Sequence, residues 1–416
     1  MTQFQKQLTN AQKAAVSVGQ LSHAKRNAAI AAIARDLRVH AKDIMAANSR
    51  DLAAFSKTDP MADRLLLNSE RIEDMAAELE GLTKLQDPIG QTYDHRTRAG
   101  LKLYRKRVPI GVIGVVYESR PNVTSDTAGI CLKSGNVVLL KGGKEGRHSY
   151  ETIVRIIHNA LKKTGVDPNA VQLINPTDRS LVKKLITAHG LVDLVIPRGS
   201  QQLINFVRAN ATVPVIETGA GVCHTFVDDS AKLEASAKII FNAKTQRPSV
   251  CNALDTLLVH QHIAKQFLPL VAKLLITKKV ELFCDPPSFA ILKKHYPTHL
   301  LKRARPADFG KEFLSLKMSI KIVSGINAAI EHIAKYSSKH SEAILTQTAA
   351  HKKLFTDLVD AAVVYTNAST RFSDGAVFGL GSEIGISTQK LHARGPMGPA
   401  ELTTYKWIVS GNYTTR

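Results

Sequence analysis

The sequence predicts an α/β protein built around a buried parallel sheet, and three observations lead to this expectation. Short apolar, β-branched runs without polar alternation occur from about residue 100 onward, as they do in strands that are buried on both faces. Segments with helical spacing of apolar residues separate these runs, which is the order that parallel strands joined by crossover helices require. Residues 1 to about 90 are instead Ala-rich and helical in pattern.

The expected elements follow one another along the chain. In the N-terminal helical region, apolar residues recur at near-helical spacing at positions 30, 33, 37 and 44. The strands expected next are 108–118, 135–143, 170–175, 191–199 and 213–219, with helices between them such as 149–165. A second α/β segment runs from about 226 to 365, with strands at 253–260 and 319–325 and a helix at 262–279. The tail 366–416 holds seven glycines between Gly375 and Gly411, and we expect loops and a terminal strand at 404–411.

Composition limits the class of protein. The chain has 416 residues, of which 44% are hydrophobic and 22% charged, as in globular proteins of two or three domains. No apolar run approaches the ~20 residues of a membrane helix, and the N-terminus lacks the apolar region of a signal peptide. We therefore expect a cytoplasmic protein without a membrane partner.

The net charge of +21 suggests anionic partners. Nucleic acid is one alternative and an anionic small substrate is another. Lys and Arg form no long block, there is one Trp, and no motif combines aromatic and basic residues as RNA-binding domains do. We therefore expect no nucleic-acid partner.

The four cysteines are predicted to be free thiols, because their spacing contains no C-x-x-C pair and fits no zinc site. No metal is expected. Cys251 differs from the others because it follows "KTQRP", with two cations, and precedes the apolar run "ALDTLLV". Positive neighbours lower the pKa of a thiol and increase its thiolate fraction. Core packing is the alternative for any single cysteine.

The glycine-rich dinucleotide fingerprint G-x-G-x-x-G is absent. Lys141 at the end of an expected strand could donate to a ribose or phosphate, with a surface lysine as the alternative. Gly199 and Ser200 open an expected helix, whose N-terminus favours an anion. An ordinary N-cap serine is equally consistent with this pattern.

Four long segments resemble the gamma-glutamyl phosphate reductase family of the aldehyde dehydrogenase superfamily. They are residues 107–136, 213–224, 242–260 and 367–409, and they fall in the family's order. The resemblance implies an aldehyde dehydrogenase-like α/β fold in three parts. These are a Rossmann-like NADPH-binding domain (1–225), an α/β catalytic domain (226–365), and a small C-terminal substrate loop and oligomerisation segment (366–416).

The resemblance also implies a reaction. The family reduces L-glutamyl 5-phosphate with NADPH to L-glutamate 5-semialdehyde and phosphate, which is the second step of proline biosynthesis from glutamate. The family's catalytic cysteine motif falls on Cys251. A thiolate that attacks an acyl phosphate expels phosphate and leaves a thioester. The thioester carbonyl can still accept a hydride, which explains why the nucleophile is a cysteine.

Two further catalytic positions follow from the resemblance. Asn122 matches the asparagine that stabilises the oxyanion, and a turn residue after Pro121 is the alternative. Glu217 falls where related aldehyde oxidisers carry the glutamate that activates water. A reductase gains nothing from hydrolysing its thioester, so the role of Glu217 stays open among orienting Cys251, deprotonating it and contacting the cofactor.

Binding residues are implied in the same way. The expected cofactor contacts are Lys141, Gly199, Ser200 and Glu312. Arg371 is expected to bind the substrate carboxylate and Asp374 its amine. Arg120 and Arg247 are rivals for the carboxylate or the phosphate, and structural salt bridges would account equally well for any one of these arginines.

The resemblance further implies partners. Superfamily members extend a partner's sheet with a C-terminal strand, so we expect a homo-oligomer, at least a dimer. We expect a separate glutamate 5-kinase to supply the acyl phosphate, with transient contact between the two enzymes. An aldehyde-oxidising dehydrogenase is the alternative within the superfamily, because Glu217 is present.

Overall fold

A computed structural model describes residues 1–56 and 59–416, which divide into two compact units. Unit 1 comprises Met1–Thr218, Phe378–Gly385 and Leu391–Arg416, and unit 2 comprises Gly219–Val377 and Ile386–Lys390. Most of the expected ranges 1–225 and 226–365 therefore fall in unit 1 and unit 2, respectively. The range 366–416 is divided between the two units.

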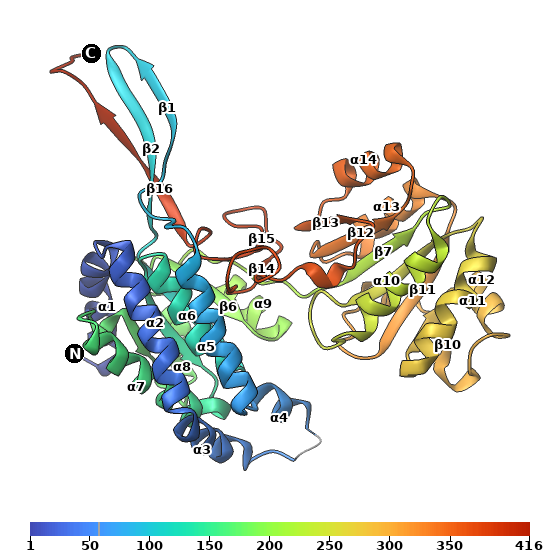
Figure 1. The fold of residues 1–416 in the computed structure, drawn as a ribbon, viewed down its shortest axis with the longest axis horizontal. Helices are drawn as coiled ribbons and strands as arrows, with labels where there is room; N and C mark the ends of the chain where they lie inside the picture. Colours follow the sequence, from blue (N-terminus) through green and yellow to red (C-terminus); the bar gives the residue numbers. More distant parts are fainter. Residues whose placement is uncertain (57–58) are drawn as a thin grey trace. The chain divides into compact units, whose positions relative to one another are not determined.

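The centre of unit 1 is a parallel sheet with the strand order β5–β4–β3–β6. Its edge strand β6 is labelled in Figure 1. Its strands are β3 (Val112–Tyr117), β4 (Val137–Gly142), β5 (Val171–Leu173) and β6 (Leu194–Arg198). Every residue of β3 and β4 is buried, because a parallel sheet is covered by helices on both faces. Strands were expected in all four of these places, and their existence is confirmed.

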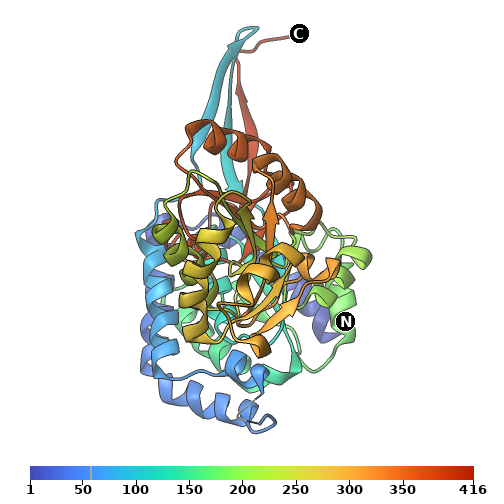
Figure 2. The same cartoon turned by 90° about the vertical axis from the view of Figure 1, so that its right-hand side faces the viewer.

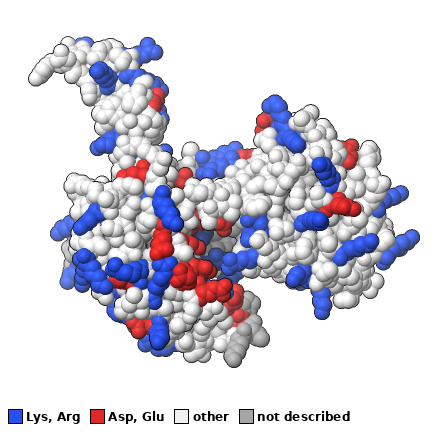
Figure 3. Space-filling model, viewed as in Figure 1, with Lys and Arg blue, Asp and Glu red and all other residues white. Residues whose placement is uncertain are grey.

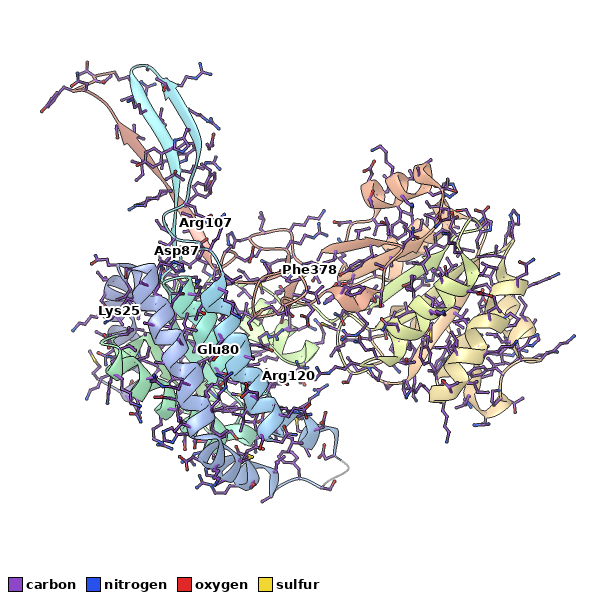
Figure 4. The ribbon with its side chains drawn as sticks, in the orientation of Figure 1. Lys25, Glu80, Asp87, Arg107, Arg120 and Phe378 are labelled. Atoms are coloured by element: carbon purple, nitrogen blue, oxygen red, sulfur yellow. The ribbon has the colours of Figure 1, made fainter. Side chains whose placement is uncertain are left out.

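Side chains at the helix starts and between helices fix the helical layers of unit 1. Ser22 Oγ accepts the backbone N–H of Lys25 at the start of α2. Arg38 of α2 pairs with two carboxylates of α5, Glu73 and Glu80, the second of which is labelled in Figure 4. The helices are α1 (Gln3–Gly19), α2 (His23–Val39), α3 (Ala41–Leu52), α4 (Pro60–Leu65), α5 (Ser69–Lys84), α6 (Asn122–Lys133), α7 (Arg147–Lys163), α8 (Ser180–Ile186) and α9 (Gln201–Asn210).

Antiparallel strands in the order β1–β2–β16 form an arm that extends from the helices of unit 1 (Figures 1 and 2). They are β1 (Thr92–Arg98), β2 (Leu101–Pro109) and β16 (Thr403–Ser410). The guanidinium of Arg105 stacks on Tyr405 and Trp407, at 4.5 and 4.7 Å from the ring centroids. At the base of the arm, Arg107 Nη1 donates to Ala400 O at 3.0 Å and Thr403 Oγ1 at 2.8 Å (Figure 4).

Two of the strand predictions need correction. The expected strand 108–118 is wrong as a single element, because β2 ends at Pro109 and β3 begins at Val112, with Gly111 at φ 132° between them. The expected strand 213–219 is also wrong. Its residues form isolated bridges instead of a ladder, among them the bridge between Val195 and Val215, since the proline at 214 has no N–H with which to continue a ladder.

Unit 2 contains a second parallel sheet, with the strand order β10–β9–β11–β8–β7–β12–β13. The strands expected at 253–260 and 319–325 correspond to β8 and β11, and the helix expected at 262–279 corresponds to α11. The strands are β7 (Cys223–Val227), β8 (Leu254–His260), β9 (Glu281–Cys284), β10 (Leu301–Arg303), β11 (Lys317–Val323), β12 (Ser341–Leu345) and β13 (Val363–Thr366). The helices are α10 (Leu233–Thr245), α11 (Ala264–Leu275), α12 (Pro286–Leu292), α13 (Ile326–Tyr336) and α14 (Ala349–Leu358).

Basic and acidic side chains are distributed differently on the face of the molecule that Figure 3 shows. On the face drawn in Figure 3, Lys and Arg are scattered, whereas Asp and Glu gather over part of unit 1. Among the described residues, no helix has both the length and the apolar content that crossing a bilayer requires.

One buried imidazole makes the stability of unit 2 depend on pH. His332 of α13 is 4% exposed and packs against the rings of His224, Phe309 and Tyr336. Burial, with smaller contributions from the neighbouring charges, lowers the pKa of His332 to about 3. The unfolded chain takes up this proton as the pH falls through about 6.5, while the folded chain stays neutral until about 3. The free energy of unfolding therefore decreases as the pH is lowered from about 6.5 to about 3.

We predict that His332→Phe reduces this loss, by at most about 1.4 kcal/mol per pH unit for one proton. Urea unfolding at pH 7 and at pH 4.5 measures it. His299→Phe, at an exposed position, should keep the wild-type pH dependence. Equal pH dependence in His332→Phe and the wild type would contradict this assignment.

Candidate active site

Cys251 lies in the turn between α10 and β8 of unit 2. The buried Lys244 ties the end of that helix to the strand, because its Nζ donates to Leu254 O at 2.9 Å and lies 3.5 Å from Asp255 Oδ1. Lys244 therefore shapes this turn, and its ammonium is engaged by β8. It is one of the two cations in the segment "KTQRP" before Cys251.

Cys251 differs from the other cysteines in exposure. Its side chain is half-buried, whereas Cys131, Cys223 and Cys284 are buried. Burial raises the pKa of the Cys284 thiol to about 12, and it also raises the pKa of Cys131 and Cys223. These three thiols are therefore poor nucleophiles, since the thiolate is the reactive form.

The carbonyl of Cys251 is held from the side of β7. Cys223 Sγ donates to Cys251 O at 3.2 Å. A Cβ at Gly221 would lie 1.5 Å from the same oxygen, so only glycine permits this approach. The backbone N–H of Gly221 in turn donates to Glu312 Oε1 at 2.9 Å. Glu312, an expected cofactor residue, thus lies in the same group of contacts as Cys251.

The next residue, Asn252, joins this turn to the loop that carries Arg371. Asn252 Nδ2 donates to Ser373 O at 2.8 Å and to Arg371 O at 3.3 Å. Thr370 Oγ1 donates to Asn252 O at 2.8 Å. Asn252 and Thr370 are 4% and 0% exposed, so water does not compete for these hydrogen bonds.

The charged groups expected around the thiol do come together in unit 2. Burial lowers the pKa of Arg371, and the charge of Arg247 lowers it further, while Cys251 and Asp374 act in the opposite direction. The Nε of Arg371 is buried and has no hydrogen-bond partner among the described residues. Asp374 Oδ1 accepts the backbone N–H of Ala376 at 3.0 Å. An anionic ligand would relieve the mutual repulsion of the two arginines.

In unit 1, the strand-end residues lie at the carboxyl edge of the sheet, where α/β proteins bind ligands. Lys141, at the end of β4, is 3% exposed, and its Nζ donates to Gly142 O at 3.0 Å and Pro176 O at 3.1 Å. Burial lowers the pKa of Lys141. Lys141 is therefore not the surface lysine that the sequence had left as an alternative.

Ser200 caps α9, as its Oγ accepts the N–H of Leu203 at 3.3 Å. A carboxylate also sits at this helix N-terminus, because Ser200 N donates to Glu118 Oε2 at 2.7 Å. A Cβ at Gly199 would lie 2.5 Å from the same carboxylate oxygen. Glu118 thus uses the Ser200 N–H at the start of α9. A dinucleotide phosphate that binds to this helix N-terminus would have to displace the carboxylate.

The remaining expected residues of unit 1 have separate surroundings. Asn122 opens α6, and its Nδ2 donates to Asp126 Oδ2 at 2.8 Å. Burial, followed by the charge of Glu78, raises the pKa of Asp126. Glu217 Oε2 lies 3.5 Å from Arg208 Nη1. Arg120 is exposed and extends from the ribbon of unit 1 (Figure 4).

Two groups of ligand-type atoms lie at the ends of β7 and β8, and they share Asp229. Asp229, His260 and His262 form one, and Asp228, Asp229 and His351 form the other, with ligand atoms within 4.8 Å in each. Internal hydrogen bonds already use some of these atoms. His351 Nδ1 lies 2.8 Å from Asp228 Oδ2, and His260 Nδ1 accepts the backbone N–H of His262 at 3.2 Å.

Sequence reasoning missed Gly221, Cys223, Asn252 and Glu118. A signal was present, because all four lie inside segments that carry the family resemblance, close to Glu217, Cys251 or Arg120. Their roles depend on contacts between segments far apart in sequence, and spacing alone does not give such contacts.

Comparisons with known proteins agree with this geometry. Residues 1–285 match the aldehyde dehydrogenase family. A gamma-glutamyl phosphate reductase of Pelodictyon phaeoclathratiforme is 50% identical over 99% of this chain and 98% of its own length. The corresponding protein of Legionella pneumophila is 48% identical, with the same coverage.

Solved structures give the same result. The crystal structure of a gamma-glutamyl phosphate reductase from Thermotoga maritima superimposes with a TM-score of 0.94, at 45% identity and full coverage of both chains. An acetylating aldehyde dehydrogenase from Geobacillus thermoglucosidasius, at 16% identity, shares the fold, with a TM-score of 0.71 over 99% of this chain and 97% of that one. The expected aldehyde dehydrogenase-like fold is confirmed. The chain belongs to the aldehyde dehydrogenase family and, within it, to the gamma-glutamyl phosphate reductases.

Proposed function

We propose that this chain reduces L-glutamyl 5-phosphate to L-glutamate 5-semialdehyde and phosphate with NADPH, the second step of proline biosynthesis from glutamate. One observation carries the proposal. The half-buried thiol of Cys251 lies in the same unit as Arg371, whose buried Nε has no partner among the described residues. A nucleophile that interacts electrostatically with a partly buried cation suits a substrate that is both electrophilic and anionic.

Cys251 forms the covalent bond in this mechanism. Its thiolate attacks the acyl carbon, the carbon–sulfur bond forms, and the bond from that carbon to the phosphate oxygen breaks, releasing phosphate. The family implies a nicotinamide cofactor, and the chemistry it supplies when bound is hydride transfer to the thioester carbonyl. Cys251 then leaves as the thiolate when the aldehyde forms.

The other residues bind and orient. Arg371 pairs with the substrate carboxylate through its planar guanidinium, and Asp374 with the ammonium. Arg247 and Arg120 are assigned to the phosphate group. Asn122 donates to the developing oxyanion, and Asp126 orients it through the hydrogen bond to Nδ2. Glu217, paired with Arg208, is assigned to the cofactor side.

The cofactor assignment rests on the carboxyl edge of the unit 1 sheet and on Glu312. Lys141 would meet the adenosine ribose, Gly199 and Ser200 the pyrophosphate, and Glu312 the nicotinamide ribose. Glu118 accepts the Ser200 N–H at the start of α9, so the pyrophosphate would take the place of this carboxylate on the helix N-terminus. The preference for NADPH over NADH is part of the proposal.

We further propose that the arm makes a homo-oligomer, at least a dimer. β16 carries Tyr405, Trp407 and Val409 at 44%, 40% and 52% exposure, an apolar set that a partner subunit would cover. A separate glutamate 5-kinase supplies the acyl phosphate through transient contact.

The central prediction concerns Cys251. Incubation with L-glutamyl 5-phosphate without cofactor should add one glutamyl group at Cys251, because no hydride is present to release the thioester. Peptide mass spectrometry locates the group. Cys251→Ala should acquire none, and Cys284→Ala, at a buried position, should be labelled like the wild type. A glutamyl group on another residue, or on none, would overturn the assignment.

Phosphate dependence separates the reductase from an aldehyde oxidiser. In the reverse direction, oxidation of L-glutamate 5-semialdehyde should require inorganic phosphate, because phosphate and not water must cleave the thioester. NADPH formation with and without phosphate measures this. Turnover that yields free glutamate without phosphate would establish the oxidising alternative.

Arg371→Gln should lower kcat/KM for the semialdehyde about 10- to 100-fold, since a charge-assisted hydrogen bond contributes about 1.5–3 kcal/mol. Steady-state kinetics in the reverse direction tests this. Arg303→Gln, an exposed arginine on β10, is the matched control and should keep wild-type values. Unchanged kinetics in Arg371→Gln would exclude this arginine from carboxylate binding.

A further inference from the structure

We propose that Asn252 is a positioning residue that fixes the separation between the Cys251 thiol and the Arg371 guanidinium, and that this separation selects the length of the acyl substrate. The inference rests on the proposed function, because it assigns the two ends of the substrate to these two side chains. It concerns a residue that itself contacts neither end.

The two side chains belong to segments far apart in sequence, so a physical connection must hold them in register. Asn252 provides it within one residue of the nucleophile. Its amide donates to the carbonyls of Arg371 and Ser373 at 3.3 and 2.8 Å, and its own carbonyl accepts from Thr370 Oγ1 at 2.8 Å. The path from Cys251 to Arg371 is therefore one peptide bond, one side chain and one hydrogen bond.

Burial makes this connection stiff. Asn252, Thr370 and Ser373 are 4%, 0% and 2% exposed. Losing the amide would remove the donor from the buried carbonyl of Ser373 and from the part-buried carbonyl of Arg371, and a buried carbonyl without a donor destabilises the fold. The Arg371 loop and the Cys251 turn therefore move together, because separating them would break these hydrogen bonds.

The other side of the nucleophile is fixed independently. Cys223 Sγ donates to Cys251 O at 3.2 Å, and Gly221 lets the backbone approach the same oxygen. We call the hydrogen bonds of Asn252 to Thr370, Arg371 and Ser373 the Asn252 tie. Because Cys251 is held against β7, this tie determines where the Arg371 loop lies relative to the thiol.

Substrate length then decides whether both ends are met. A homologue that is one carbon shorter lacks one bond of about 1.5 Å. If Arg371 holds the carboxylate, the reacting carbon falls short of the thiol, and a displacement of about 1 Å can cost a factor of about 10² in rate. If the hydrogen bonds of Asn252 were lost, the loop that carries Arg371 could move toward the thiol and accommodate the shorter substrate.

The experiment compares Asn252→Ala with the wild type in the reverse direction. Phosphate-dependent oxidation is measured with L-glutamate 5-semialdehyde and with the one-carbon-shorter L-aspartate 4-semialdehyde. The kcat/KM for L-glutamate 5-semialdehyde divided by that for L-aspartate 4-semialdehyde should be at least about tenfold lower in the variant than in the wild type. The main cause should be a lower rate on the longer substrate.

A second measurement needs neither substrate nor cofactor. Cys251 is alkylated with iodoacetate, which carries a carboxylate, and with neutral iodoacetamide. A nearby Arg371 favours the anionic reagent, so the ratio of the two rates should fall in Asn252→Ala toward its value in Arg371→Gln. General loss of stability would slow or speed both reagents alike.

Two further variants distinguish loss of these hydrogen bonds from general loss of stability. Thr370→Val removes one hydrogen bond of the tie at nearly constant volume, and it should shift both ratios in the same direction if Asn252→Ala does not fold. Asn48→Ala is the matched control, because Asn48 is 1% exposed and its amide donates to Leu65 O and Ser149 Oγ in unit 1. It should lower stability and leave both ratios unchanged.

The outcomes separate this inference from the proposed function. Wild-type ratios in both tie variants would overturn the role of Asn252, even if the reductase reaction is observed. If the wild type oxidises neither semialdehyde, the proposed function fails, and the alkylation ratio alone supports or overturns the tie.

Discussion

A parallel strand must have both of its faces covered, and this constraint organises both units of the molecule. The strands β3, β4 and β8 are buried along their whole length, so polar side chains are excluded from their middles except where a partner satisfies them. Functional groups are left to the strand ends and to the turns that precede or follow the strands. Lys141, Glu118 and Cys251 occupy such positions, at the end of β4, after β3 and before β8.

The same constraint explains how much could be read from the sequence. Continuous apolar runs predict β3, β4, β6, β8 and β11, because burial on both faces leaves a strong local pattern. The hairpin of β1 and β2 was missed, since its residues are mostly charged or polar and its burial pattern is mixed. Cys251 could be singled out because its neighbours in sequence supply both cations and a buried strand. Asn252, Cys223 and Gly221 could not, because their contacts arise only when β7, the Cys251 turn and the Arg371 loop meet.

The charged groups differ between the two units. Burial and then the charge of Arg247 lower the pKa of Arg371, and Cys251 and Asp374 only partly compensate for this. In unit 1 acidic groups predominate instead, because Glu118 lies at the start of α9 and Asp126 accepts from Asn122 within α6. The net charge of +21 is therefore a poor guide to either site. Individual charges matter here through burial and local partners, which composition does not report.

The glycine at 221 has a consequence for the unfolded chain. No side chain fits between this residue and the carbonyl of Cys251, so the position must retain the conformational freedom of glycine. That freedom lowers the stability of the folded state by about 0.4–1 kcal/mol relative to alanine at a compatible position. The placement of the nucleophile is thus tied to a loss of conformational entropy at another residue. Stabilising unit 2 by the usual replacement of glycine with alanine would, at this position, displace the reactive turn.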